Sequence, residues 1–596
     1  MKTFCVQTLG CKVNHYESEQ IAALLRSRGL TQTDASHADL RVIHTCSVTT
    51  QAASQSRQAA RRMVRLPLLT EPTAHLTSAR ACCESQGCVN SRGETSHDPE
   101  PREADILLKA HPSPEARSEI QAADLPAGRP RVIVTGCWAT SDQSAASAVA
   151  GVDAVVSHHQ DVRLELDRLL TLWQGEQRPV PRRDPDNPRD YVRPHEPVLE
   201  PLRKDEGWMI EAGTPVDQLT PHIEPKLSDT VNQNLAGNDG ADVRTAPQAR
   251  AEFLPRGGAD DPRLGTTALP LLGQRQTGRQ RAFLKIQDGC DAHCTYCIIP
   301  SLRTKLWSKP VEDAVQEANA LVVAGHVEIV LTGIFLGAYG QPTALRRRQP
   351  QGTDKPLSAL IDALCTRVPG LRRLRLSSLE PGDLTDELLS VLRSHAQVVP
   401  HFHLPLQSGS DTLLRKMNRQ YTRDDFLRMI DRVNNAFDRP ALTTDVVAGF
   451  PGESDEEFNR TLEVVEAARF IHVHAFPYSP RPGTAAARWT KQFVRGPVVN
   501  ERIDHLRAVA ADHSFTFRSS FLGETVEVIV ERDAATADDA PNISASASDP
   551  PTRHGRCERY FPVFFNDPRP RPGDSARLKI TDVSPEQTIG QLTTDH

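Results

Sequence analysis

Apolar, β-branched runs alternate with amphipathic helical stretches between residues 281 and 476, and this repetition constrains the fold more than any other feature. The expected strands are 282–287, 327–332, 373–377, 398–404, 441–447 and 471–476. The expected helices between them are 310–324, 355–368, 383–394, 423–437 and 454–469. Repeated strand–helix units build parallel sheets or barrels, because each crossover helix packs back on the sheet. A complete eight-unit barrel takes about 250 residues. The six units within residues 281–517 therefore predict a partial (β/α)6 barrel.

The first 174 residues predict a smaller α/β domain built on a parallel sheet. Its strands are expected at 2–8, 39–44 and 131–135. Its helices are expected at 17–28 and 51–64. In such a sheet the carboxyl ends of the strands meet at one edge, where functional groups collect. Cys11, Cys46 and Cys137 each follow one of these strands. We therefore expect their thiols at the same edge.

The remaining regions are less regular. Residues 518–596 contain short β-like runs separated by turn residues, which predict a small β-barrel with an expanded loop at about 533–555. Residues 175–280 hold 14 of the 45 prolines and predict a disordered linker. An aperiodic stretch at about 67–129 predicts an insertion in the N-terminal domain. The expected fold class is thus α/β, with a small β domain at the end.

Charge and cysteine content restrict the class of protein. The 596 residues carry a formal net charge of −6, so the chain lacks the overall basic field that is typical of nucleic-acid-binding proteins. Neither a signal peptide nor a membrane-spanning segment is predicted, and we expect a soluble cytoplasmic protein. In a reducing compartment the 12 cysteines are expected to be metal ligands, catalytic thiols or buried small residues rather than disulfides.

The strongest local motif is C-x3-C-x2-C at Cys290, Cys294 and Cys297, directly after the first strand of the predicted barrel. Three cysteines hold three irons of a 4Fe-4S cluster and leave the fourth iron open to a substrate or cofactor. The alternative is a zinc site completed by His293 or by a distant ligand, although structural zinc prefers four fixed protein ligands. The spacing favours the cluster.

The N-terminal cysteines form the second group of candidate ligands. Three thiols at one end of a parallel sheet can hold another 4Fe-4S cluster with an open iron of its own. The alternative is that Cys11, Cys46 and Cys137 are independent buried residues. Geometry alone leaves these two possibilities about equal.

The cysteine motif after the first barrel strand resembles the signature of radical S-adenosylmethionine (SAM) enzymes. This resemblance implies that the open iron binds SAM and that an electron from the cluster releases a 5′-deoxyadenosyl radical. Gly333, Glu380 and Gly449 follow the second, third and fifth strands and are candidate SAM contacts. A glycine after a strand is more often only a turn, so the order of these positions along one barrel is what supports the assignment.

The passages around Cys11, Cys46 and Cys137, together with residues 287–300 and 375–381, resemble the methylthiotransferase family. That family joins a three-cysteine domain to a radical SAM barrel and a C-terminal TRAM domain. The resemblance implies a second 4Fe-4S cluster that supplies or carries sulfur, one SAM that methylates it and another that yields the radical. It also implies a low-potential electron donor as a partner, whereas the sulfur donor is unknown.

Substrate choice separates the branches of this family. Residues 7–14 and 331–340 resemble the branch that modifies C2 of N6-threonylcarbamoyladenosine beside the tRNA anticodon. The isopentenyladenosine branch tends to begin with tyrosine-glycine-cysteine-glutamine, whereas this chain has Gly10, Cys11 and Lys12. The expected partner is therefore the tRNA anticodon stem-loop. The alternatives are isopentenyladenosine in tRNA, an aspartate of a ribosomal protein, and a non-catalytic metal-containing RNA-binding protein.

Two features remain without an assigned role. Cys82, Cys83 and Cys88 lie in the predicted insertion, where an additional metal site is less expected than no ligand role. Residues 521–596 contain 13 acidic and 8 basic side chains, which is unusual for a module expected to grip RNA phosphates. Candidates for a local basic patch are Arg553, Arg556, Arg559, Arg569 and Arg571.

Overall fold

The computed structural model describes residues 1–69, 129–175, 280–346, 356–531 and 553–593. Nearly all of the predicted linker, most of the predicted insertion with its three cysteines, and most of the predicted loop at 533–555 lie outside these residues. Among the helices of the described ranges, none is both long enough and apolar enough to cross a membrane.

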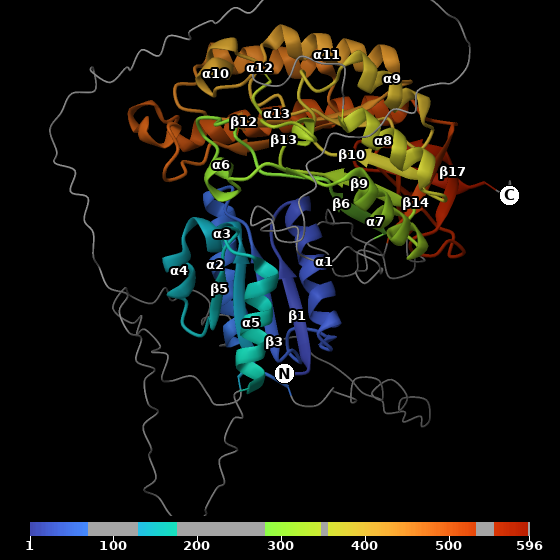
Figure 1. The fold of residues 1–596 in the computed structure, drawn as a ribbon. Coiled ribbons are helices and arrows are strands. Elements are labelled where there is room, and N and C mark those ends of the chain that lie inside the picture. The colour runs from blue at the N-terminus through green and yellow to red at the C-terminus, as the bar shows by residue number, and fades with distance from the viewer. Residues whose placement is uncertain (70–128, 176–279, 347–355, 532–552, 594–596) are drawn as a thin grey trace, which may run out of the picture. The chain divides into compact units, whose positions relative to one another are not determined.

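A five-stranded parallel sheet forms the centre of the N-terminal domain (Figure 1). Its strands are β1 (Thr3–Thr8), β2 (Thr31–Gln32), β3 (Leu40–Thr45), β4 (Arg131–Gly136) and β5 (Ala154–Val156). Its helices are α1 (Lys12–Ser27), α2 (Thr50–Arg65), α3 (Cys137–Ser141), α4 (Gln143–Ser147) and α5 (Val162–Gly175). In the strand order β2-β1-β3-β4-β5, β2 is added on one side of β1 and the later strands are added on the other side, so the order of addition switches between β1 and β3. In open parallel sheets this reversal point is where ligands bind, at the carboxyl ends of the strands.

Helices cover both faces of this sheet, because side chains alternate between the faces along each strand. Phe4 and Val42 pack with α1 and α5 in one apolar cluster, whereas Cys5 and Ile43 pack with α2, α3 and α4 in another. The sequence predicted β1, β3, β4, α1 and α2. It missed β2 and β5 because two and three residues are too few to show alternation.

Six parallel strands form the central barrel, as the sequence predicted. They are β6 (Arg281–Lys285), β9 (Glu328–Thr332), β10 (Arg373–Leu376), β11 (His401–His403), β12 (Ala441–Ala448) and β13 (His472–Pro477). β6, β9 and β10 pair in one sheet, and β11, β12 and β13 pair in another. A parallel bridge between Leu374 and Val398 joins the two sheets. The predicted fold class is therefore confirmed.

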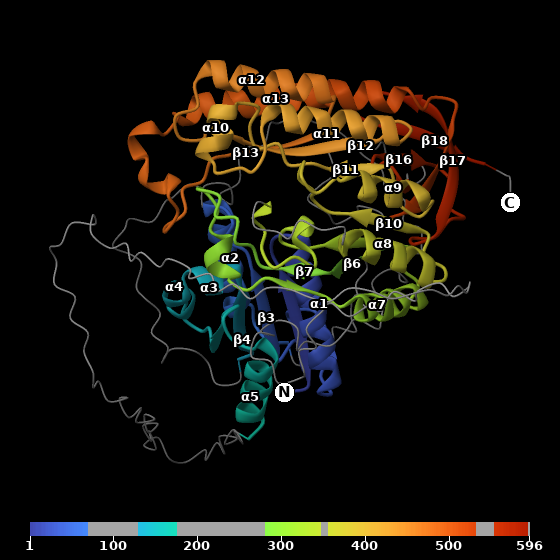
Figure 2. The ribbon, with the colours of Figure 1, turned by 45° about the horizontal axis from the view of Figure 1, so that its top comes forward.

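The helices around the barrel include all those predicted from the sequence. They are α7 (Val311–Val323), α8 (Pro356–Arg367), α9 (Asp386–Ser394), α10 (Asp411–Lys416), α11 (Arg423–Ala436), α12 (Asp455–Ala468) and α13 (Gly496–Ser519). The shorter elements are β7 (Gln287–Asp288), β8 (Trp307–Ser308), α6 (Ile299–Leu302) and the 3-10 turns η4 (Leu336–Ala338), η6 (Ala486–Arg488) and η7 (Thr490–Gln492). Figure 2 shows α11, α12 and α13 covering the side of the barrel formed by β11, β12 and β13.

The barrel strands separate apolar from polar side chains. One set of alternating residues, represented by Leu284, Leu331, Leu374, Phe402 and Val446, belongs to the large core shared with the surrounding helices. The residues between them must face the barrel interior, because successive side chains of a strand point to opposite faces. The charged and histidine members of this interior set are Arg281, Lys285, Glu328, Arg373, Arg375, His401, His403, Asp445, His472 and His474.

A closed five-stranded barrel follows α13. Its strands are β14 (Thr525–Val530), β15 (Arg553–Cys557), β16 (Pro562–Phe565), β17 (Ser575–Val583) and β18 (Thr588–Leu592), in the order β14-β15-β16-β18-β17. The expected loop extends too far, because its last three residues, Arg553 to Gly555, pair with β16. The hydrogen-bonded ladder overrides the weak local pattern there.

The arginines of this barrel are largely bound within the chain. Arg556 pairs with Glu531 at 3.2 Å, Arg559 with Glu558 at 2.7 Å, and Arg569 with Asp567 at 2.6 Å. Arg553 donates to the carbonyl of Pro570. The basic patch considered from the sequence is thus mostly neutralised by its own neighbours.

Candidate metal centres and the buried bridge between them

Cys290, Cys294 and Cys297 lie on the loop that follows β7. Gly289 lets this loop pass close to its neighbour, since its φ is 77° and a Cβ there would lie 2.0 Å from the Lys305 carbonyl oxygen. No other residue fits that position without moving the backbone. On its other side the loop is held by Asn418, whose amide donates to the carbonyls of Ala292 at 3.2 Å and His293 at 3.1 Å. The motif is therefore fixed in place by the fold.

The three thiols of this loop lie close enough for their charges to interact. Burial raises the pKa of Cys290 and of Cys297 to about 12, so both are neutral thiols at pH 7 unless a metal displaces the proton. The Arg419 guanidinium donates to Cys294 Sγ at 3.2 Å, and the Ala292 amide donates to Cys290 Sγ at 3.5 Å. Donors aimed at sulfur suit an electron-rich metal–thiolate group.

Glu380, a predicted SAM contact, joins this group of residues. It forms ion pairs with Arg419 and with Arg346, the latter at 3.0 Å. Because Arg419 also reaches Cys294, one chain of contacts connects the end of β10 to the cysteine loop. The structure therefore brings Glu380 beside the three thiols.

The other two predicted SAM contacts are tightly packed glycines. A Cβ at Gly333 would lie 3.0 Å from the Gln287 side chain, whose amide donates to the Gly289 carbonyl of the cysteine loop. Gly449 has a φ of 73°, and a Cβ there would meet Val499 of α13 at 2.4 Å. Packing alone is thus sufficient to require glycine at Gly449, and its contact with SAM remains a prediction.

The second predicted triad is also assembled by the fold. Cys11, Cys46 and Cys137 follow β1, β3 and β4, which are neighbours in the sheet, and their charges interact. Gly10, with a φ of 105°, places the backbone before Cys11 so that a Cβ would lie 2.9 Å from Cys46 Sγ. Cys46 and Cys137 are buried, whereas Cys11 is exposed. The sheet therefore forms a three-thiol site with one accessible member.

Local contacts hold the cysteine loops in place, and burial keeps the Cys46 and Cys137 thiols protonated. Asn14 donates to the Leu9 carbonyl at 2.8 Å and to the Thr45 carbonyl at 3.0 Å, which ties the first two cysteine loops together. Burial raises the pKa of Cys137 to about 12 and also raises that of Cys46, although backbone amides of residues 47 and 48 donate to the Cys46 sulfur. As in the first triad, the ligand set fits a metal centre that replaces thiol protons.

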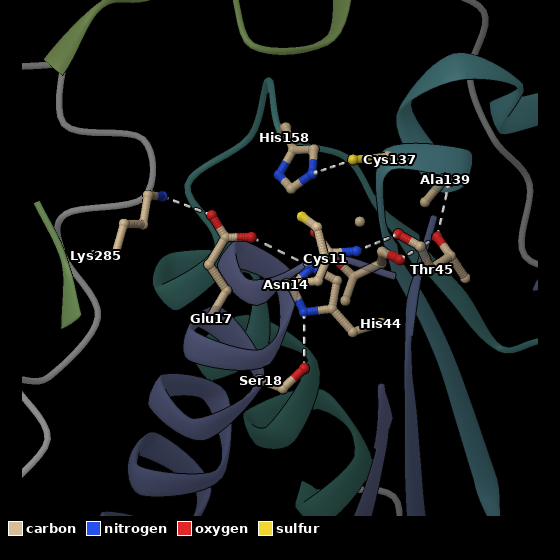
Figure 3. A network of polar contacts seen from close by, with 12 residues as sticks. Cys11, Asn14, Glu17, Ser18, His44, Thr45, Cys137, Ala139, His158 and Lys285 are labelled. Carbon is tan, nitrogen blue, oxygen red and sulfur yellow. Dashed lines mark hydrogen bonds and ion pairs between the residues drawn. The ribbon is translucent and has the colours of Figure 1, made fainter. Parts of the chain in front are cut away.

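A buried network of charges lies beside the N-terminal triad, and Figure 3 shows two of its members, Glu17 and Lys285, with Cys11 and Cys137. Glu17 of α1 accepts from Lys285 at 2.6 Å and from Arg303 at 2.8 and 2.9 Å. Asp288 accepts from the same two cations at 2.6 and 2.9 Å. All four side chains are at least nine-tenths buried. We call Glu17, Lys285, Asp288 and Arg303 the buried bridge.

The buried bridge is linked to each cysteine site through one intervening residue. Arg303 Nη2 lies 3.3 Å from His158 Nε2, which in turn lies 3.7 Å from Cys137 Sγ. At the other end, the Asp288 carboxylate accepts from the Gly289 amide at 2.9 Å, one residue before Cys290. A continuous series of polar contacts thus runs from one triad to the other.

Electrostatics within the bridge favour the charged forms. Burial alone raises the pKa of the Glu17 carboxyl, but Arg303 and Lys285 outweigh this effect and hold it well below its usual range. Burial and the Arg303 charge lower the pKa of His158, which is therefore neutral at pH 7. The bridge thus pairs two carboxylates with two cations.

Sequence reasoning missed the buried bridge and Arg419. The available signal was weak: Glu17 occupies a position in α1 between the buried residues Tyr16 and Ser18. A charged residue at a buried helical position must find a partner. The sequence does not reveal which one, because Glu17 and Arg303 are 286 positions apart.

Two family models match the chain, one in the N-terminal domain and one in the barrel. The model described as "Radical SAM superfamily" matches residues 284–465, and the model described as "Uncharacterized protein family UPF0004" matches residues 3–108. Threonylcarbamoyladenosine tRNA methylthiotransferase MtaB of Bacillus subtilis (strain 168) is 28% identical over 593 residues, which cover 99% of this chain and 96% of that protein.

Two further relatives share higher identity over shorter stretches. MtaB of Chlamydia pneumoniae is 40% identical over 255 residues, which cover 43% of this chain and 58% of that protein. The tRNA-2-methylthio-N(6)-dimethylallyladenosine synthase 1 of Mycobacterium marinum is 37% identical over 317 residues, which cover 52% of this chain and 58% of that protein. These two matches span little more than half of each relative, whereas the Bacillus match is nearly full length. Residues 284–465 thus match the radical SAM superfamily, and nearly the whole chain is similar to a tRNA methylthiotransferase.

Proposed function

We propose that this chain is a tRNA methylthiotransferase that modifies C2 of N6-threonylcarbamoyladenosine beside the anticodon. The observation that carries the proposal is the pair of three-thiol sites, one in the barrel and one in the N-terminal sheet, joined by the buried bridge. The nearly full-length similarity to the Bacillus enzyme supports the choice of nucleoside. A tRNA substrate in turn implies that the protein works in the cytoplasm.

The cysteines divide between two proposed cofactors. Cys290, Cys294 and Cys297 would hold one 4Fe-4S cluster with SAM, and Cys11, Cys46 and Cys137 would hold a second 4Fe-4S cluster. When bound, these groups supply an organic radical and a sulfur atom that can be methylated. Adenine C2 carries a strong C–H bond without an acidic proton, so general acid–base residues are poorly suited to activate it. The reaction also requires a low-potential electron donor and a sulfur source.

The chain's own residues prepare the site for this chemistry. Arg419 donates to Cys294 and places a positive charge beside the thiolates, and Glu380 holds Arg419 in position. Glu380 also offers a carboxylate near the loop, suited to the ammonium or a hydroxyl of SAM. The buried bridge fixes the N-terminal domain against the barrel, so that the two thiol sites keep one mutual arrangement.

Mass spectrometry of tRNA nucleosides tests the proposal. A host that lacks this activity would express the parent chain, Cys290→Ala or Cys11→Ala. Cys365→Ala serves as a matched control, because Cys365 is a buried thiol that packs in the barrel core. We expect the methylthio derivative of threonylcarbamoyladenosine with the parent chain and with Cys365→Ala, and its loss with each of the other two variants. Its absence from all four strains, with soluble protein that contains iron, would overturn the proposal.

A second nucleoside is favoured by one observation. The Mycobacterium relative, named for the dimethylallyl (isopentenyl) nucleoside, is 37% identical over 317 residues. If the parent chain produced methylthio-isopentenyladenosine instead, the chemistry would stand and the nucleoside would change. The same digest measures both products, so one experiment separates the two candidates.

A further inference from the structure

Two histidines and an aspartate meet on three neighbouring strands of the central barrel. They are His403 of β11, Asp445 of β12 and His474 of β13. All three belong to the interior set of the barrel strands. Their side-chain ligand atoms, one from each residue, lie within 4.8 Å of one another. The sheet therefore brings together three groups of the kind that bind divalent transition metals.

The parallel register explains why these side chains meet. Asp445 pairs with His474 across β12 and β13, and His403 pairs with Thr443, which lies two residues before Asp445. Side chains two positions apart on a strand point to the same face, so these residues share one face of the sheet. The group contains no cysteine and thus differs in its donor atoms from both thiol sites.

The distances suit a zinc ion. Zn²⁺ binds imidazole nitrogen and carboxylate oxygen at about 2.0–2.2 Å, so two such ligand atoms of a tetrahedral site lie about 3.4 Å apart. His403 Nε2 and Asp445 Oδ2 are 3.2 Å apart. β13 is an edge strand of its sheet and His474 is exposed, so an ion can reach the group from solvent.

Neighbouring side chains leave one nitrogen of each histidine for a metal. His403 Nδ1 lies 3.0 Å from the Thr443 hydroxyl oxygen, and His474 Nδ1 lies 3.2 Å from His472 Nε2. Because Nδ1 is engaged in both rings, Nε2 is the nitrogen that remains for a bond to a metal. Histidines that bind metals usually have such a partner on the other nitrogen, which fixes the orientation of the ring.

We propose that His403, Asp445 and His474 bind one divalent transition-metal ion, with Zn²⁺ as the favoured ion. Thr443 and His472 orient the two histidines. Imidazole ligands suit Zn²⁺, whereas Mg²⁺ and Ca²⁺ prefer oxygen ligands. Three protein ligands leave a fourth position for water or for an oxygen atom of a bound molecule. The site is additional to the two proposed clusters and does not depend on which nucleoside the chain modifies.

Zinc bound per chain tests the site. The full chain, loaded with iron and sulfur, is dialysed against buffered free Zn²⁺, and elemental mass spectrometry gives zinc and iron per chain. His474→Gln and Asp445→Asn each remove a ligand, and Thr443→Val removes the hydroxyl group behind one. His395→Gln is the matched control: His395 pairs with Asp362 at 2.9 Å, and within the described residues this pair has no third ligand.

We expect one zinc ion per chain in the parent and in His395→Gln, and its loss from His474→Gln and Asp445→Asn with unchanged iron. Thr443→Val should weaken zinc binding roughly 10- to 100-fold, as the loss of a partner behind a ligand does. The site is refuted if the parent chain retains no zinc, or if zinc persists in both ligand variants.

X-ray absorption at the zinc edge provides a test that needs only the parent chain, so it decides even where a variant does not fold. We expect a shell of nitrogen and oxygen atoms at about 2.0–2.2 Å from zinc. A sulfur shell at about 2.3 Å would place the zinc in a cysteine site and would overturn the proposal. Failure of the proposed function is a separate result, since it appears as missing product in the nucleoside assay.

Discussion

Replacing Arg303 by methionine tests the buried bridge most directly. Arg303→Met keeps most of the side-chain volume but removes the cation that binds both Glu17 and Asp288. Lys285 then faces two buried carboxylates alone. One negative charge is left without a partner in a region that water does not reach, and the folded state must bear that cost.

The expected magnitude follows from this imbalance. Breaking a buried ion pair by removing one partner costs about 3–5 kcal/mol, because the remaining charge is uncompensated. With a urea dependence of about 2 kcal/mol per molar for a domain of moderate size, the unfolding midpoint should fall by roughly 1.5–2.5 M. A double variant, Glu17→Gln with Arg303→Met, restores charge balance and should recover part of the lost stability.

Urea titration with hydrogen-exchange mass spectrometry is the appropriate assay. The chain has several domains, so peptides from β1, β3 and α1 are needed to assign the transition to the N-terminal domain. Arg168→Met is the control, because Arg168 is an exposed residue of α5 that pairs with Glu165 within the same helix. The reasoning is refuted if Arg303→Met shifts the midpoint no more than Arg168→Met does. It also fails if the double variant is less stable than Arg303→Met alone.

Three shorter predictions concern other features. Gly289→Ala should distort the cysteine loop and lower the iron bound per chain, because the added Cβ would overlap the Lys305 carbonyl oxygen. A normal iron content would contradict the idea that the loop must pass close to Lys305. Because the folded-state pKa of Glu17 is depressed, its stabilisation is complete above the unfolded value of about 4.3 and is lost as the pH falls below it. The urea midpoint of the parent chain should therefore fall more than that of Glu17→Gln between about pH 6 and pH 3, and parallel curves would count against this linkage. The guanidinium carbons of three arginines lie within 5.0 Å of the centre of the Tyr560 ring, and Tyr560 has a φ of 77°. Tyr560→Leu should therefore lower the thermal stability of the C-terminal barrel, as measured by calorimetry. An unchanged Tm would rule out a stabilising role for these contacts.

The sequence predicts the barrel and both cysteine groups well because each depends on local patterns. Short apolar runs mark β6, β9 and β12, and the helices between them are amphipathic. Parallel strands end at a common edge, so three cysteines that follow three neighbouring strands come together without further information. The same reasoning could not place α13, which runs through the boundary expected at residue 517.

The charged partners could not be predicted for a physical reason. Burial of a charge is a tertiary event, and the helical period of α1 shows only that Glu17 is on the inner side. Its partner depends on how α1 packs against β6, which no local pattern encodes.

The buried bridge has a consequence for exchanging domains between related enzymes. The N-terminal domain contributes one negative charge, Glu17, whereas the barrel contributes two cations and Asp288, a net charge of plus one. Each domain alone therefore contributes an unbalanced charge to the buried bridge, and the net charge of the bridge is zero only when the two domains are packed together. A transplanted N-terminal domain without an acid at this position would bury a surplus cation at the seam. Compatible chimaeras can thus be chosen by reading a single residue of the donor.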